Sequence, residues 1–237
     1  MSFAHYTTLS FDAMCYHAAR RNYNSAAECI PRIRQAENDF NELLQRETAL
    51  LEKHGNDLDA TYDEHEQLAI IMENREYEIG SAYGPFLQHL ATVHILCVTS
   101  LEAHINIRAK ETLEGRFFED FERKSLKNKW LFLPRHLGVP GFDPGAEPFR
   151  SLSRLVKCRN SIVHYKGRKE EWNREGGVPT FLKVLGFTIE ATEDSLNCVK
   201  SMIAALANQL HQEPPHWLYM EDGGYFESEF ELDIHRR

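Results

Sequence analysis

Apolar residues recur at helical spacing along most of this chain, and no segment alternates between apolar and polar residues as a half-buried strand would. Residues 86–114 form the most hydrophobic segment and are apolar nearly all round, which is typical of a helix buried in a bundle. The same spacing predicts further helices over 117–129, 149–165 and 187–211. The sequence therefore predicts an all-α fold.

The first third of the chain contains several helix-breaking residues. We expect a short helix over 11–22, a break at 24–25, and a second helix that begins at Pro31, because proline suits the first turn of a helix. A third helix then ends near Ile79, and glycine and proline predict a break over 80–85. The second and third helices together predict an antiparallel helical hairpin.

These signals divide the chain into three parts. Residues 1–84 hold the N-terminal helices with the hairpin, residues 85–212 form a helical bundle, and residues 213–237 form an acidic, aromatic tail. The hairpin either packs on the bundle or extends from it, as a solvent-facing pair of helices or a coiled-coil contact for a partner. The tail is either an inert solvated segment or a mimic of nucleic acid that occupies a basic surface.

The charge is unevenly distributed. The formal net charge of −9 argues against a non-specific nucleic-acid binder. Between residues 150 and 174, however, there are eight cationic side chains and only two acidic ones, Glu170 and Glu171. An anionic ligand would be drawn to this segment and repelled by the tail.

Other classes of protein find little support. The best candidate for a membrane span, residues 90–101, is too short and contains His94, and the N-terminus lacks a signal-peptide pattern, so we expect a soluble, cytoplasmic protein without membrane contact. Neither the five scattered cysteines nor the spacing of the 12 histidines matches a disulfide framework or a metal site. We expect no metal and no cofactor.

Arg159 is the unusual residue of the 149–165 segment. On an ideal helix, six apolar residues gather into one stripe and Arg159 projects from its middle; they are Phe149, Leu152, Leu155, Val156, Ile162 and Val163. A guanidinium cannot deprotonate, so its burial without a partner costs several kcal/mol. Either Glu102 on the 86–114 helix pairs with Arg159 as structural support, or Arg159 lines a cleft that an anion enters. The two interpretations are compatible.

Asn160 and His164 are four residues apart and share one side of this helix, with Ser153 and Lys157 close by. Cleavage of an RNA phosphodiester needs a base for the 2′-hydroxyl, an acid for the 5′-oxygen and a cation for the transition state. Histidine and arginine supply these without a metal, and Asn160 can donate a hydrogen bond to phosphate or ribose.

The run Arg159-Asn160-x-x-x-His164 resembles the R-x4–6-H motif of HEPN domains, and the apolar helix around residues 100–106 looks like the family's earlier core helix. The resemblance covers about residues 85–212. It implies a HEPN-like helical bundle that dimerises and places two copies of the motif around one cleft. It further implies a toxin or antiviral defence effector that cuts RNA without metal and leaves a 2′,3′-cyclic phosphate. Arg159 and His164 would be catalytic, and Asn160 supportive.

Two functions from different classes remain open. The first is this endoribonuclease, with RNA, a second copy of the chain and an antitoxin or regulatory protein as partners. From charge alone, we expect contacts to the RNA backbone from Lys157, Lys166 and Arg168. The second is a catalytically inactive HEPN-like scaffold that binds a partner protein or RNA through the same cleft. Trp130, Phe132 and Trp217 either stack on bases or cover a core.

Overall fold

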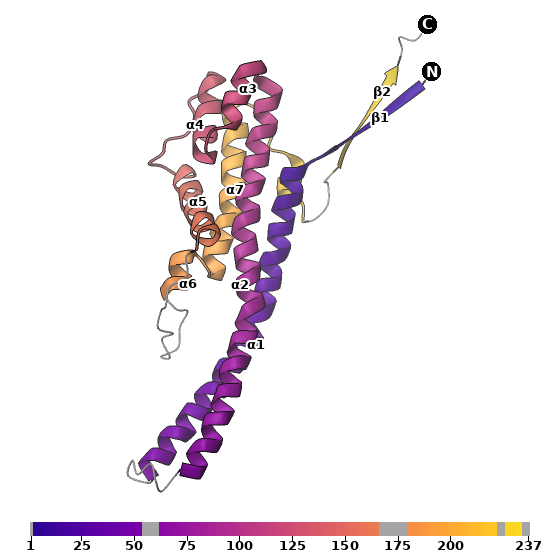
Figure 1. Cartoon of the computed structure of the whole chain (residues 1–237). Coiled ribbons are helices and arrows are strands. Elements are labelled where there is room, and N and C mark those ends of the chain that lie inside the picture. The colour runs from indigo at the N-terminus through magenta and orange to yellow at the C-terminus, as the bar shows by residue number, and fades with distance from the viewer. Residues whose placement is uncertain (1, 54–61, 166–179, 222–225, 234–237) are drawn as a thin grey trace. The chain divides into compact units, whose positions relative to one another are not determined.

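The computed structural model describes residues 2–53, 62–165, 180–221 and 226–233. It is mostly helical, as predicted, and Figure 1 shows the order of the elements. The helices are α1 (Phe11–Lys53), α2 (Tyr62–Thr112), α3 (Gly115–Glu122), α4 (Leu126–His136), α5 (Phe149–Val163), α6 (Thr180–Leu185), α7 (Ile189–Gln209) and the short 3₁₀ helix η2 (His216–Tyr219).

The two predicted breaks in the N-terminal part are wrong, because α1 and α2 continue through Pro31 and Pro85. A proline inside a helix removes one backbone hydrogen bond and frees the carbonyl four residues earlier. Those carbonyls belong to Ala27 and Ser81, and all four residues are exposed, so water can satisfy the freed groups. Burial of the neighbouring apolar residues then outweighs the local preference to end the helix.

The chain forms two compact units, one of residues 24–90 and one of residues 1–23 with 91–237. In the first unit α1 and α2 run antiparallel: the Tyr83 hydroxyl donates to Glu37 over 2.6 Å, and Arg75 lies 3.6 Å from the Asp39 carboxylate. The expected division between residues 84 and 85 falls within α2, and residues 11–23 contribute to the core of the second unit.

The second unit is a helical bundle around the C-terminal half of α2. The prediction of a central buried helix is confirmed, because Val93, Cys97, Leu101 and Ile105 are each fully buried. Side chains from the other elements of this unit close the core around them; the largest are Tyr16, Phe121, Trp130, Leu133, Leu152, Met202, Ile203, Leu206 and Leu218. This core is the scaffold on which α4 and α5 are held.

Two buried histidines of α2 join it to its neighbours. His104 Nδ1 lies 2.8 Å from the Asp12 carboxylate at the start of α1, and that carboxylate also accepts the Ala13 N–H. His94 Nδ1 lies 2.9 Å from the Ser195 hydroxyl of α7, and its Nε2 lies 2.8 Å from the Gly186 carbonyl oxygen. Buried polar groups need such partners, so these contacts fix how the helices pack.

A two-stranded antiparallel sheet was not expected from the sequence. Strand β1 (Ser2–Leu9) pairs with β2 (Phe226–Asp233), from Ser2 opposite Asp233 to Leu9 opposite Phe226. The two partners come from opposite ends of the chain, so no local pattern links them. The mostly helical structure is consistent with the all-α fold expected from the sequence, and this small sheet is an addition that the sequence did not predict.

One helical stretch of the described residues, Asp63–Thr112, is long and apolar enough by length and composition to cross a membrane. Half of its most apolar part is buried inside the protein, which is also typical of the core helix of a soluble protein. The cytoplasmic location expected from the sequence stays a prediction.

Candidate functional site

A pocket of about 590 Å³ lies against one side of α5. Five of its lining residues belong to α5, His164 follows directly at the end of that helix, and Lys127 belongs to α4; the α5 residues are Ser153, Val156, Lys157, Asn160 and Ser161. Their spacing of three and four residues places them along one face of a helix. Phe149, Leu152 and Leu155 are buried in the core and hold α5 in position. We call this hollow the α5 pocket.

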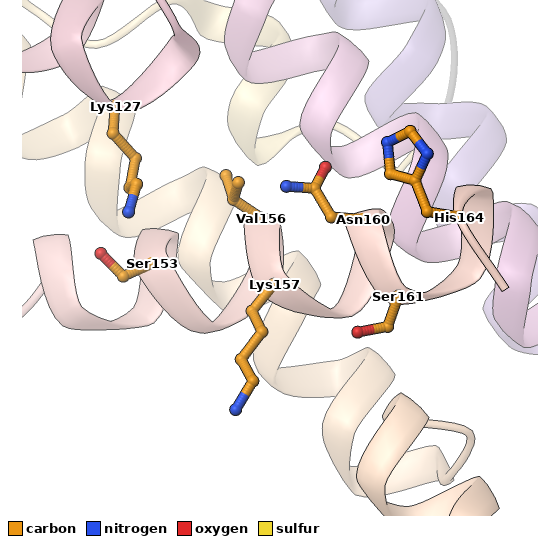
Figure 2. A pocket seen from close by; sticks show the side chains of 7 residues that line it. All are labelled: Lys127, Ser153, Val156, Lys157, Asn160, Ser161 and His164. Carbon is orange, nitrogen blue, oxygen red and sulfur yellow. The ribbon is translucent and has the colours of Figure 1, made fainter. Parts of the chain in front are cut away.

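The α5 pocket presents cations and hydrogen-bond donors, and none of its lining residues is acidic. Figure 2 shows Lys127 reaching toward α5, with Asn160 and His164 projecting together on one side of that helix. Neither Lys127 nor Lys157 has an ion-pair partner within the described ranges of the chain. Two uncompensated ammonium groups beside an amide and an imidazole form a site for an anion.

The end of α5 sets the position of His164. The helix ends at Val163, and the backbone N–H of His164 still donates to the Asn160 carbonyl over 3.0 Å. This last turn places the His164 imidazole directly beyond the Asn160 amide, as the four-residue spacing predicts. Both side chains are exposed, so a ligand can reach the imidazole.

Arg159 is half-buried and does not line the α5 pocket. Five residues at about 100° each turn it roughly 140° away from His164 around the helix axis. The spacing of the motif therefore separates the guanidinium from the imidazole within one chain.

The first of the two interpretations of Arg159, an ion pair with Glu102, is wrong. Glu102 instead lies 2.9 Å from the Lys129 ammonium, and Arg159 has no ion-pair partner in the part of the chain that the structure describes. Lys129 is only 3% exposed, whereas Arg159 keeps contact with solvent. A buried ammonium loses more hydration energy, so the carboxylate stabilises Lys129 more than it would stabilise Arg159.

The remaining candidates divide into three groups. Lys157 lines the pocket, as proposed, but Lys166 and Arg168 lie outside the described residues. Trp130 and Trp217 are buried in the core and are not available to bases. Lys127 was missed, because it comes from another helix and no sequence spacing connects it to α5.

Comparisons with known proteins leave the family open: no protein-family model, no curated protein and no solved structure matches this chain. The residues of the α5 pocket therefore carry the functional proposal by themselves.

Proposed function

We propose that this chain is a metal-independent endoribonuclease of HEPN type that acts in toxin–antitoxin or antiviral defence. The observation that carries the proposal is the composition of the α5 pocket. Lys127, Lys157, Asn160 and His164 line it, and no acidic side chain does. Such a pocket attracts the phosphate of a polynucleotide and places a proton carrier beside it.

The proposed reaction is an internal transfer. The ribose 2′-oxygen attacks the adjacent phosphorus and loses its proton to a base, and the bond from phosphorus to the 5′-oxygen breaks as an acid protonates that oxygen. The products are a 2′,3′-cyclic phosphate and a 5′-hydroxyl. His164 carries one of these protons and a water molecule carries the other, the lysine ammonium groups stabilise the charge on the phosphorane-like transition state, and Asn160 donates to a phosphate oxygen.

A second copy of the chain supplies what one chain lacks. The reaction uses a strong cation beside the imidazole, but the α5 pocket of one chain excludes Arg159. In a symmetric dimer whose α5 faces meet, the shared cleft holds two composite sites, and each site receives His164 from one copy and Arg159 from the other. We therefore propose a homodimer with composite sites.

The absence of Arg159 from the α5 pocket also favours a second candidate function. In this alternative the protein is a catalytically inactive scaffold, and the same pocket binds RNA or a partner protein such as an antitoxin without bond cleavage. The two candidates share a ligand surface and differ only in the chemical step.

The deciding experiment incubates the purified full chain with mixed RNA in EDTA. We expect the wild type to cut RNA and leave cyclic phosphate ends, while His164→Ala and Arg159→Ala do not cut. Arg46→Ala, at an exposed position of the 24–90 unit, is the matched control and should cut like the wild type. Equal cleavage by every variant would indicate a contaminant, and RNA binding without cleavage would support the scaffold.

A further inference from the structure

A second pocket, of about 480 Å³, lies on another face of α4. It is lined by Lys124, Asn128, Leu131, Phe132, Arg135 and His136. All but Lys124, which precedes the helix, are on α4, and their spacing of three and four residues gathers them on one face. We call this hollow the α4 pocket. The proposed reaction does not use it.

Stacked rings form one part of the α4 pocket. The rings of Phe132 and His136 are nearly parallel, with centroids 5.4 Å apart and planes inclined by 17°. Phe132 also contacts Phe121 of the core, which anchors the stack. At the outer end His136 is exposed and contacts Phe117, which is 66% exposed. Flat rings that reach solvent in this way offer a surface on which another ring can stack.

Cationic side chains flank these rings. The Lys124 ammonium lies 5.0 Å from the centre of the Phe132 ring, and Arg135 is exposed at the other end of the pocket. Gly141, at φ +79°, leaves room for the Arg135 stem, since an added Cβ would lie 3.1 Å from Arg135 Cγ. Neither cation has an ion-pair partner among the residues of the described ranges, and no acidic residue lines the pocket.

Aromatic rings beside unpaired cations match the chemistry of an unpaired nucleotide. The base stacks on the rings, whatever its identity, and the cations neutralise the phosphate. The Asn128 amide adds a donor and an acceptor for a base edge. An acidic protein segment would use the cations but would leave the ring surface in water.

We propose that the α4 pocket is a nucleobase-stacking subsite for single-stranded RNA. This inference rests on the proposed function, and it names the substrate as RNA with at least one unpaired nucleotide beside the cleaved bond. Lys127 lines the α5 pocket and Asn128 lines the α4 pocket, so neighbouring faces of one helix carry both sites. A strand cut in the α5 pocket passes across α4 and places a flanking base on His136.

The test measures binding without cleavage. The probe is a short 2′-O-methyl RNA that carries 2-aminopurine; its 2′-oxygens cannot attack phosphorus, and its fluorescence is quenched by stacking. We expect the full-length wild type to quench it, and the Phe117→Ala/His136→Ala double variant to bind about ten-fold more weakly with little quenching. An oligomer of the same backbone without bases should bind both proteins equally. Arg46→Ala should behave as the wild type.

Arg135→Glu is the second variant, at an exposed position whose replacement leaves the core intact. This variant should bind both the 2-aminopurine probe and the oligomer without bases more weakly than the wild type does, because the substitution removes a phosphate contact. Wild-type affinity and quenching in the double variant would overturn the proposal. Because the probe cannot be cleaved, a failure of the nuclease proposal appears only in the EDTA assay, and a failure of the stacking subsite appears only here.

Discussion

His164 lines the α5 pocket, and Arg159, five residues earlier on the same helix, does not. The helical repeat turns the two side chains roughly 140° apart, so they leave the helix on different sides. Arg159 is half-buried and has no ion-pair partner within the described residues, which leaves its charge open to a ligand or a second copy of the chain. In the proposed reaction, Arg159 therefore comes from a second copy of the chain.

Replacement of Lys127 and Lys157 by alanine should weaken RNA binding and its dependence on salt. Each phosphate contact with single-stranded RNA contributes about −0.7 to the slope of log K against log salt, so loss of both lysines should reduce the slope by roughly 1 to 1.5. Fluorescence anisotropy at several salt concentrations measures this slope. Arg46→Ala is the control, and an unchanged slope in the double variant would show that these lysines do not bind the backbone.

Gly186→Ala should be clearly destabilising. Gly186 has φ +76°, and an added Cβ would lie 2.9 Å from Cys158 Sγ and 3.2 Å from His94 Nε2. Gly138→Ala is a matched control, because Gly138 has φ +78° with nothing within 4 Å of its Cβ. The backbone strain of about 1–2 kcal/mol is common to both variants, and the contacts add to it only at Gly186. Urea unfolding measures the free energy of unfolding of both variants. An equal loss of stability in the two would mean that Cys158 and His94 move aside from the added Cβ at no cost.

His94 should make the stability of the protein depend on pH. Burial lowers the pKa of His94, and the hydrogen bond to the Gly186 carbonyl only partly offsets this. Below about pH 6.5 the unfolded chain therefore binds this proton more readily than the folded protein does. The stability that neutral His94 contributes is present above that pH and is lost as the pH falls through the pKa of the folded state.

The measurement is the free energy of unfolding of the wild type and of His94→Gln at pH 7.5 and pH 5. The free energy of unfolding of the wild type should exceed that of the variant by more at pH 7.5 than at pH 5, since only the wild type carries the titrating imidazole. The same difference at both pH values would show that His94 does not titrate in this range.

The buried contact between Asp12 and His104 should contribute more to stability than an exposed ion pair. Asp12→Ala leaves His104 Nδ1 and the Ala13 N–H without their acceptor, at a cost of about 2–4 kcal/mol. Glu111→Ala, which removes the exposed partner of Arg108, should cost less than about 1 kcal/mol. Thermal unfolding compares the two, and similar small losses would show that water replaces the Asp12 carboxylate.

The helical repeat was enough to predict the α5 side of the candidate site. Ser153, Lys157, Asn160 and His164 follow one another at three- and four-residue steps, and this relationship is local to one helix. Lys127 could not be predicted, because its approach depends on how α4 packs. The partner of Glu102 was assigned incorrectly for the same reason, since the burial of Lys129 depends on tertiary structure.

The fold was predictable in its class and less so in its boundaries. The apolar pattern around Leu101 and Ile105 identified the central helix, because the face that these residues share with Val93 and Cys97 is fully buried. Pro31 and Pro85 misled the prediction, since the outcome at a proline depends on whether its face of the helix is exposed. The pairing of β1 with β2 joins the two ends of the chain, which no sequence window contains.

The most direct test of the composite site mixes two inactive variants. Arg159→Ala and His164→Ala are each assayed alone in EDTA, then mixed in equal amounts under conditions that exchange subunits. In a mixed dimer one composite site lacks both groups and the other retains both, and half of the dimers are mixed. The mixture should therefore recover about a quarter of wild-type cleavage, with cyclic phosphate ends. A mixture as inactive as either variant alone, with exchange confirmed, would contradict a site shared between two copies.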